Sequence, residues 1–182
     1  MLAVLAKTRR RFFEFGTATG RTTYLLARNS PPDARVTTIT LAPDAHGDYT
    51  GAGGDDRHAA RSALAESAFT RFRYSGTDVE HKVEQFFGDS KQLDTAPYRD
   101  SMDLIFIDGS HALSYVQSDT QKAMEMLAPG GIILWHDYTP LRKGGRDVVR
   151  ALNALRERYA LVRLSETTLV AWRREAPAPP SQ

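Results

Sequence analysis

Short apolar runs recur along the chain and alternate with stretches of helical spacing. Seven of these runs have the length and composition of strands, at 11–16, 36–41, 82–87, 103–108, 132–135, 161–164 and 169–172. The run DLIFID at 103–108 is almost continuously apolar, which is typical of a central parallel strand covered on both faces. The last two runs lie close enough in the sequence to pair as a hairpin.

Helical spacing predicts the segments that connect these strands. We expect helices at 21–29, 58–72, 147–159 and from about Ser114 to the PGG at 129–131. The helix from Ser114 would bury one face, made of Val116, Thr120, Ala123, Met124 and Leu127. Strand and helix therefore alternate, which predicts a Rossmann-like, doubly wound α/β fold. Its mostly parallel sheet would end in an antiparallel C-terminal hairpin and form the middle layer of an α/β/α sandwich.

At 182 residues, the chain has the length of one domain, which we place at 1–174. Residues 42–60 break all periodicity and are rich in Gly, Asp and Ala, so we expect a mobile loop or lid there. The tail EAPAPPSQ at 175–182 has the composition of a disordered segment.

Composition narrows the class of protein. The sequence is 41% hydrophobic and 25% charged with a net charge of +2, and its basic residues are scattered, so no nucleic-acid partner is indicated. There is no cysteine, which excludes thiolate metal sites and thiol nucleophiles. No apolar run reaches membrane-spanning length, and the start places its apolar residues before its charges, unlike a secretory signal. We therefore expect a cytoplasmic protein without a membrane partner.

The stretch FEFGTATGRTTYLL at 12–25 predicts a strand, a tight glycine loop and a helix, the usual arrangement for nucleotide binding. A dinucleotide fingerprint would place glycines at 16, 18 and 21, but Ala18 and Arg21 stand at two of these positions, which disfavours NAD. The later strands end in GDS at 88–90, FIDGSH at 106–111 and WHDY at 135–138. Polar groups thus gather at the edge of the sheet where an α/β protein binds ligands.

Four stretches together resemble a known family: FEFGTATGRTTYLL, FFGDSKQLD, APYRDSMDLIFIDGSHALSYVQSDTQKAMEMLAPGGIILWHDY and LVRLSETTLVAWRR. They are similar to class I S-adenosylmethionine-dependent methyltransferases, in particular to the small bacterial O-methyltransferase-like group. The resemblance covers roughly residues 12–173, and its most specific segments are DLIFIDGSH and PGGIILWHDY. It implies S-adenosylmethionine as the cofactor and a small molecule as the methyl acceptor, with a hydroxyl oxygen as the expected site.

The resemblance also implies which residues bind the cofactor. The loop residues Gly16, Thr17, Ala18, Thr19 and Gly20 would face its methionine and ribose part. Glu14 would orient this loop or reach the methionine amine through water, and Asp89 with Ser90 would meet the adenine edge. Asp108 would face the sulfonium end and the substrate.

One position departs from the family pattern. The second strand usually ends in an acid that binds both ribose hydroxyls, whereas this sequence reads TITL, with Thr40 in the place of the acid. A hydroxyl makes weaker hydrogen bonds than a carboxylate, so we expect weaker cofactor binding unless Asp44 substitutes. The departure also motivates the alternative function, a catalytically inactive module that binds the cofactor or a partner.

Four strand-end residues are the candidates for the chemistry: Asp108, His111, His136 and Asp137. A histidine could take the proton of an acceptor hydroxyl while an aspartate orients it. Alternatively, Asp108 and Asp137 could hold Mg²⁺, although no third ligand is apparent because Tyr138 follows Asp137. Only ten residues precede the first predicted strand, so we expect the 42–60 loop or the second subunit of a homodimer to close the pocket.

Overall fold

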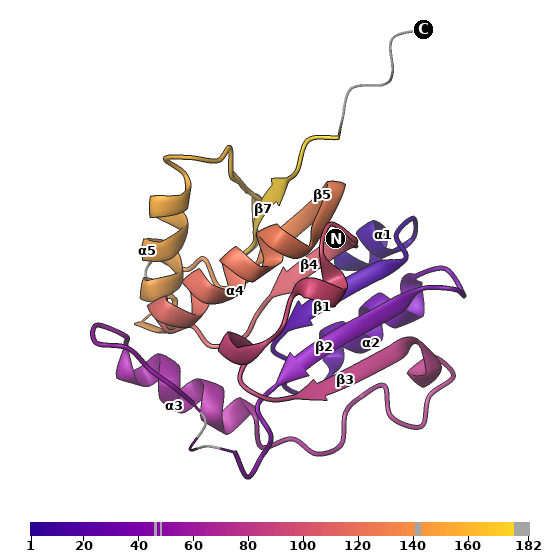
Figure 1. Cartoon of the computed structure of the whole chain (residues 1–182), viewed down its shortest axis with the longest axis horizontal. Coiled ribbons are helices and arrows are strands. Elements are labelled where there is room, and N and C mark those ends of the chain that lie inside the picture. Colours follow the sequence, from indigo (N-terminus) through magenta and orange to yellow (C-terminus); the bar gives the residue numbers. More distant parts are fainter. Residues whose placement is uncertain (46, 48, 141–142, 177–182) are drawn as a thin grey trace, which may run out of the picture.

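The computed structural model describes residues 1–45, 47, 49–140 and 143–176, so the last six residues of the predicted tail lie outside the described part. The chain forms one sheet of seven strands in the order β3-β2-β1-β4-β5-β7-β6 (Figure 1). These strands are β1 (Arg11–Phe15), β2 (Arg35–Thr40), β3 (Val83–Phe87), β4 (Met102–Ile107), β5 (Leu127–Trp135), β6 (Val162–Arg163) and β7 (Val170–Arg173). The first five are parallel, whereas β7 runs antiparallel to both β5 and β6. The predicted fold class is therefore confirmed.

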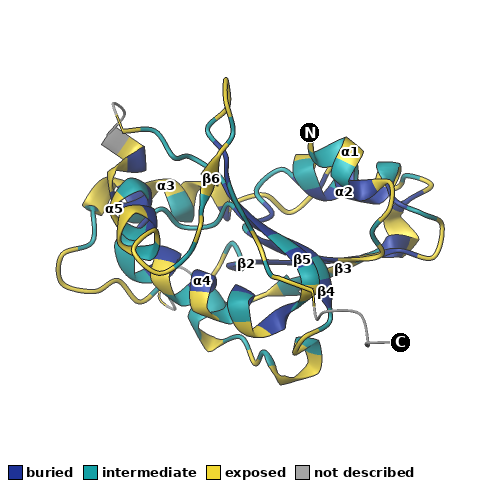
Figure 2. Cartoon of the chain, turned by 90° about the horizontal axis from the view of Figure 1, so that it is seen from above, coloured by how far each residue is buried: buried dark blue, intermediate teal, exposed yellow. Residues whose placement is uncertain are grey.

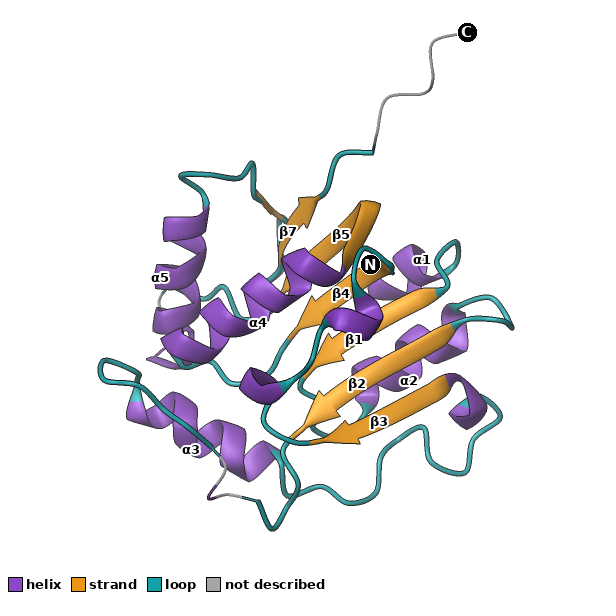
Figure 3. Cartoon of the chain, viewed as in Figure 1, coloured by secondary structure: helices purple, strands orange, loops and turns teal. Residues whose placement is uncertain are grey.

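Helices cover both faces of this sheet (Figures 2 and 3). The α-helices are α1 (Leu2–Ala6), α2 (Arg21–Asn29), α3 (Arg57–Glu66), α4 (Leu113–Met126) and α5 (Arg146–Leu155). Short 3₁₀ turns are η2 (Glu80–Lys82), η3 (Ser90–Gln92), η4 (Ala96–Tyr98) and η5 (Lys143–Gly145). Helices α1 and α2 lie on one face and α4 on the other, while α3 lies beyond the carboxyl ends of the strands (Figures 1 and 2). Within the described residues, no helix is long and apolar enough to cross a membrane.

Successive side chains along each strand point to opposite faces of the sheet, and this alternation produces two hydrophobic cores. On β1, Phe12 packs with Leu26 of α2, whereas Phe13 and Phe15 pack with Val116 of α4 on the other face. All of these side chains are buried. The central strands thus contribute apolar residues to both cores, which explains why their sequences read as nearly continuous apolar runs.

Three of the predicted helices end earlier than expected, and one of them, α5, occupies 146–155 rather than 147–159. Helix α3 occupies 57–66 rather than 58–72, because the carboxylate of Asp56 caps its start by accepting a hydrogen bond from the amide of His58. Helix α4 ends at Met126, and Leu127 already belongs to β5, where it pairs with Met102. Placing Leu127 on the helix face was therefore wrong. The short helix α1 was not predicted.

Candidate active site

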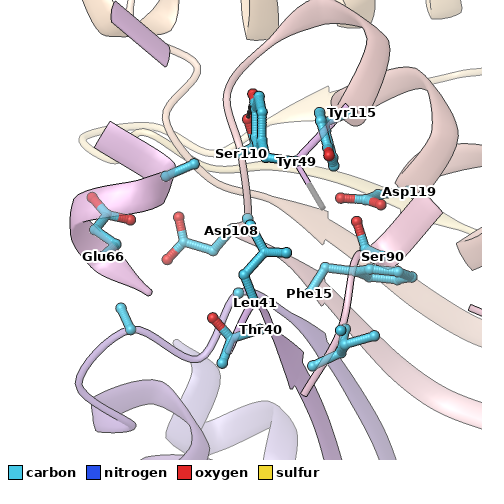
Figure 4. A pocket seen from close by; sticks show the side chains of 16 residues that line it. Phe15, Thr40, Leu41, Tyr49, Glu66, Ser90, Asp108, Ser110, Tyr115 and Asp119 are labelled. Carbon is cyan, nitrogen blue, oxygen red and sulfur yellow. Dashed lines mark hydrogen bonds between the residues drawn. The ribbon is translucent and has the colours of Figure 1, made fainter. Parts of the chain in front are cut away.

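The carboxyl ends of the parallel strands frame two neighbouring cavities. The inner cavity is lined by residues that follow β1, β2, β3 and β4, including Ala18, Thr40, Ser90 and Asp108, and its free volume is about 50 Å³ (Figure 4). The outer cavity is lined by other residues of the glycine loop, including Thr17 and Thr19, and has a volume of about 520 Å³. Gly16, Ala18 and Asp108 line both cavities, so Asp108 stands at their junction.

The glycines of the loop are required by packing within the protein itself. Gly16 has a φ of +92°, and a Cβ there would lie 2.2 Å from the carbonyl oxygen of Asp108. Gly20 has a φ of +71°, and a Cβ there would lie 2.8 Å from the Cβ of Phe72. Both positions therefore favour glycine, because its φ is positive there and a Cβ would clash with neighbouring atoms. Gly20 begins α2 and lines neither cavity, whereas Thr17 and Thr19 line the outer cavity.

Glu14 is buried below this loop. Its Oε2 accepts hydrogen bonds from the hydroxyls of Thr23 and Thr38, the second at 2.8 Å, and its side chain lines the outer cavity. The hydroxyl of Thr38 also lies 2.8 Å from that of Thr17, which accepts from Gln85. Burial raises the pKa of Glu14 to about 8, against the opposing effect of the two threonine hydrogen bonds. The carboxyl thus ties the loop to α2 and β2.

The four predicted chemical residues form one group at the ends of β4 and β5, which we call the strand-end cluster: Asp108, His111, His136 and Asp137. The Nδ1 of His136 lies 2.9 Å from Asp108 Oδ1 and 3.2 Å from Asp137 Oδ2. His111 Nε2 lies 3.1 Å from the same Oδ2 of Asp137. Both histidines therefore share Asp137, and the structure brings all four candidate residues together.

Charge in the cluster favours protonated histidines. Hydrogen bonding to Asp108 and Asp137 raises the pKa of His136 to about 10, although burial opposes this. Burial disfavours the charged form of His111, but its hydrogen bond to Asp137 and the negative charges of Asp137, Asp108 and Glu66 together raise its pKa. The two histidines in turn hold the pKa of Asp137 below its usual range. Asp137 has a positive φ of 54°, an uncommon conformation that is often found at functional sites.

Three residues of the cluster offer a set of ligand atoms for a metal ion. One atom each from Asp108, His111 and Asp137 lies within 4.8 Å of the others. Two carboxylates and an imidazole suit a divalent cation. His111 thus offers a ligand atom beside the two aspartates, which the sequence analysis had not assigned to a metal.

Residues 13–138 match a family model described as a methyltransferase domain. The chain belongs to this family of methyltransferase domains. A search of the curated proteins found none that matches.

Solved structures show the same fold as this methyltransferase domain. One is the O-methyltransferase TomG from Streptomyces achromogenes in complex with SAM, with 23% identity, a TM-score of 0.62, and coverage of 95% of this chain and 78% of that one. Another is the O-methyltransferase from Bacillus cereus in complex with SAH, with 18% identity, a TM-score of 0.58, and coverage of 95% and 77%. The predicted resemblance to class I methyltransferases is thus confirmed.

Two residues predicted to bind the cofactor differ in their surroundings. Thr40 ends β2 and lines the inner cavity, whereas Asp44 is exposed and lines neither cavity. Asp89 is buried, and its carboxylate accepts hydrogen bonds from the amide of Lys91 at 2.9 Å and from the hydroxyl of Thr50 at 3.1 Å. It does not line the inner cavity of the methyltransferase domain, although its neighbour Ser90 does.

Several lining residues escaped the sequence analysis. Tyr49 comes from the 42–60 stretch, which has no periodic pattern, and Glu66 ends α3, within the helix predicted at 58–72. Tyr115 and Asp119 come from α4. Asp119 follows Val116 by three residues, so an acid on the buried face of a predicted helix was the available signal.

Proposed function

We propose that this chain is an S-adenosylmethionine-dependent methyltransferase that acts on a hydroxyl oxygen of a small molecule. The observation that carries this proposal is the position of Asp108. It lines both cavities and belongs to the strand-end cluster, so it joins the two cavities to a group of charged residues. The O-methyltransferase neighbours with bound SAM or SAH support the same conclusion.

The residues present fit such a cofactor. The inner cavity combines the apolar side chains of Ile39 and Leu41 with the unpartnered buried oxygen Oδ1 of Asp119. The outer cavity offers Glu14 and Arg21 for the amine and the carboxylate of the methionine part. When bound, S-adenosylmethionine supplies a methyl group made electrophilic by its sulfonium. The loop from Gly16 to Gly20 and Thr40 would hold it, and this positioning can lower a barrier by roughly 7–11 kcal/mol.

Entry of a nucleoside requires a lid to move. The free volume of about 50 Å³ in the inner cavity is far below the roughly 300–1,000 Å³ of small-molecule sites. We propose that residues 49–66, called the lid segment below, move outward to admit the cofactor. Tyr49, Ala63 and Glu66 of this segment line the cavity.

The strand-end cluster would prepare the acceptor. Asp108 lines the cavities and would contact the acceptor hydroxyl, whereas His111 lines neither cavity. A histidine can accept a proton only when neutral, and the raised pKa of His136 favours its charged form. We therefore assign a positioning role to His136. Its positive charge balances the negative charges of Asp108 and Asp137, and its contacts with them orient both carboxylates.

We also propose that the cluster binds a divalent cation through Asp108, His111 and Asp137. Such a cation would supply positive charge that favours the ionised form of the acceptor hydroxyl. Calorimetric titration with Mn²⁺ and Mg²⁺ tests this, and Asp137→Asn should abolish the binding. Equal cation binding by this variant would remove Asp137 from the site.

The main experiment is calorimetric titration with S-adenosylmethionine, S-adenosylhomocysteine and NAD. We expect both sulfur ligands to bind and NAD not to bind. Turnover is then measured on a panel of hydroxyl acceptors with and without Mg²⁺, for the natural chain and for Asp108→Ala. Binding of NAD alone would refute the proposal, and cofactor binding without turnover would favour the inactive-module alternative.

A further inference from the structure

Asp119 is a buried acid with an oxygen that no group of the described residues satisfies. It lies on α4 and is 1% exposed, and its Oδ1 has no hydrogen-bond partner. Its other oxygen faces the backbone at Gly109, where an added Cβ would lie 3.5 Å from Oδ2. An unsatisfied buried oxygen costs stability, so its presence in a native fold calls for an explanation.

The position of Asp119 explains the unsatisfied oxygen, because Asp119 lines the inner cavity. Figure 4 shows its carboxyl group between Tyr115 and Ser90, and Leu41 and Phe15 line the same cavity. The apolar and aromatic residues there suit a flat base. The glycine loop and the outer cavity are assigned to the methionine part of the cofactor. The adenine base would therefore lie in the inner cavity, beside the residues that follow β3. Asp119 is then the acid that a base in this cavity meets.

Asp89 was the acid expected at the adenine edge, but its bonds are directed elsewhere. Its Oδ1 accepts from the amide of Lys91, and its Oδ2 accepts from the hydroxyl of Thr50. Lys91 itself turns to the carbonyl of Thr50 at 2.6 Å and to the hydroxyl of Ser114 at 2.8 Å. Neither side chain lines the inner cavity.

We propose that Asp119 recognises the exocyclic amine of the cofactor's adenine, accepting its hydrogen bond at Oδ1. This inference rests on the proposed function. An amine is a donor, and a carboxylate oxygen without a partner is an acceptor. Burial raises the pKa of Asp119 to about 7, so an approaching donor would offset the cost of holding a charge there. Asp119 would thus set the preference for adenine over a base that lacks the amine at the same position.

The test compares two ligands that differ only at that position: S-adenosylhomocysteine and its 6-deamino analogue, in which a hydrogen atom replaces the exocyclic amine. Calorimetry measures both with the natural chain, with Asp119→Asn and with the matched control Asp89→Asn. A hydrogen bond to a charged group corresponds to about 10-fold to 100-fold in affinity. We expect the natural chain and Asp89→Asn to prefer the adenine ligand by this factor, and Asp119→Asn to lose the preference. Thermal unfolding verifies that each variant is folded, and Asp119→Ser replaces the first variant if Asn prevents folding.

The remaining outcomes are decisive in either direction. Equal binding of both ligands by the natural chain would overturn the inference without needing a variant. A parallel loss for both ligands in Asp119→Asn, with the preference kept, would assign Asp119 to loop packing instead. Loss of the preference in Asp89→Asn would make Asp89 the recognising acid. If the natural chain binds neither sulfur ligand, the proposed function itself fails, which is a distinct result.

Discussion

At the end of β2, Thr40 stands where the family resemblance leads us to expect an acid. Its side chain is half-buried and lines the inner cavity. We predict that Thr40→Asp binds S-adenosylhomocysteine more tightly, because a carboxylate can accept two charge-assisted hydrogen bonds from ribose hydroxyls where threonine makes one weaker bond. One such bond is worth about 1.5–3 kcal/mol, so the gain measured by calorimetry should be tenfold or more.

Asp44 provides the control for this prediction. It is exposed and lines neither cavity, so Asp44→Asn should leave the affinity unchanged. A weaker affinity in Asp44→Asn, together with no gain in Thr40→Asp, would show that Asp44 replaces the missing acid.

The raised pKa of Glu14 predicts that the stability of the fold depends on pH. Its pKa is raised to about 8 in the folded chain, chiefly by burial, from its usual value of 4.5. The folded state therefore binds a proton that the unfolded state has released between these two values. The stability that depends on this proton is fully present below pH 4.5 and is lost as the pH rises to about 8.

Glu14→Gln should remove much of this pH dependence, since glutamine stays neutral and can keep a bond to Thr23 or Thr38. Urea unfolding at pH 5 and pH 8 measures the effect. We expect the natural chain to lose more stability between these pH values than the variant. Asp119, whose pKa is also raised, should leave a smaller dependence in the variant. Identical losses in both proteins would show that Glu14 is ionised in the fold.

At the scale of elements, contacts between distant parts of the chain hold the lid segment. The ring of Tyr49 stacks on Tyr115 with centroids 4.6 Å apart, and its hydroxyl lies 2.8 Å from that of Ser110. Farther along, Asp55 accepts hydrogen bonds from the amide and hydroxyl of Ser114 at 2.9 Å and 2.7 Å. The segment is therefore tied mainly to the start of α4.

We predict that Tyr49→Ala loosens the lid segment. The substitution removes the stacked ring and the bond to Ser110, so the amide of Thr50, which donates to the hydroxyl of Tyr115, should exchange its hydrogen faster. Hydrogen exchange read by mass spectrometry compares the peptides of 49–56 with those of β4. Phe69→Ala, an exposed aromatic beyond α3, serves as the control. Unchanged exchange in 49–56 would mean that the remaining bonds suffice to hold the segment.

These contacts also explain what the sequence could predict. The strands and α2 were predictable because apolar runs and local spacing determine them, and α2 has the bounds that were expected. The strand-end cluster was predictable because parallel strands bring their carboxyl ends together. The lid contacts and the role of His111 beside Asp137 were not, because they join residues far apart in sequence that share no periodic pattern. The hydrogen bond of Asp89 with Thr50 was not predictable for the same reason, since Thr50 comes to it from the lid segment.

At the scale of the whole molecule, the two cores share one sheet. Leu26 of α2 belongs to the core on one face, and Leu152 of α5 belongs to the core on the other. The strands between them carry side chains for both cores, so neither can lose its packing without disturbing the other. We therefore expect the described part of the chain to unfold as one cooperative unit.

Leu26→Ala tests whether unfolding is cooperative, because it removes packing from the core on one face of the sheet only. Leu26 is fully buried, and its truncation should cost about 2–5 kcal/mol of unfolding free energy. Both tryptophans, Trp135 and Trp172, pack in the opposite core, so their fluorescence reports on the face that the substitution does not touch. We expect fluorescence and far-ultraviolet circular dichroism to show the same lowered urea midpoint. The exposed Arg28→Ala on the same helix should shift both by less than about 1 kcal/mol. A fluorescence midpoint that stays at the natural value, while circular dichroism moves, would mean that the two cores unfold separately despite the shared sheet.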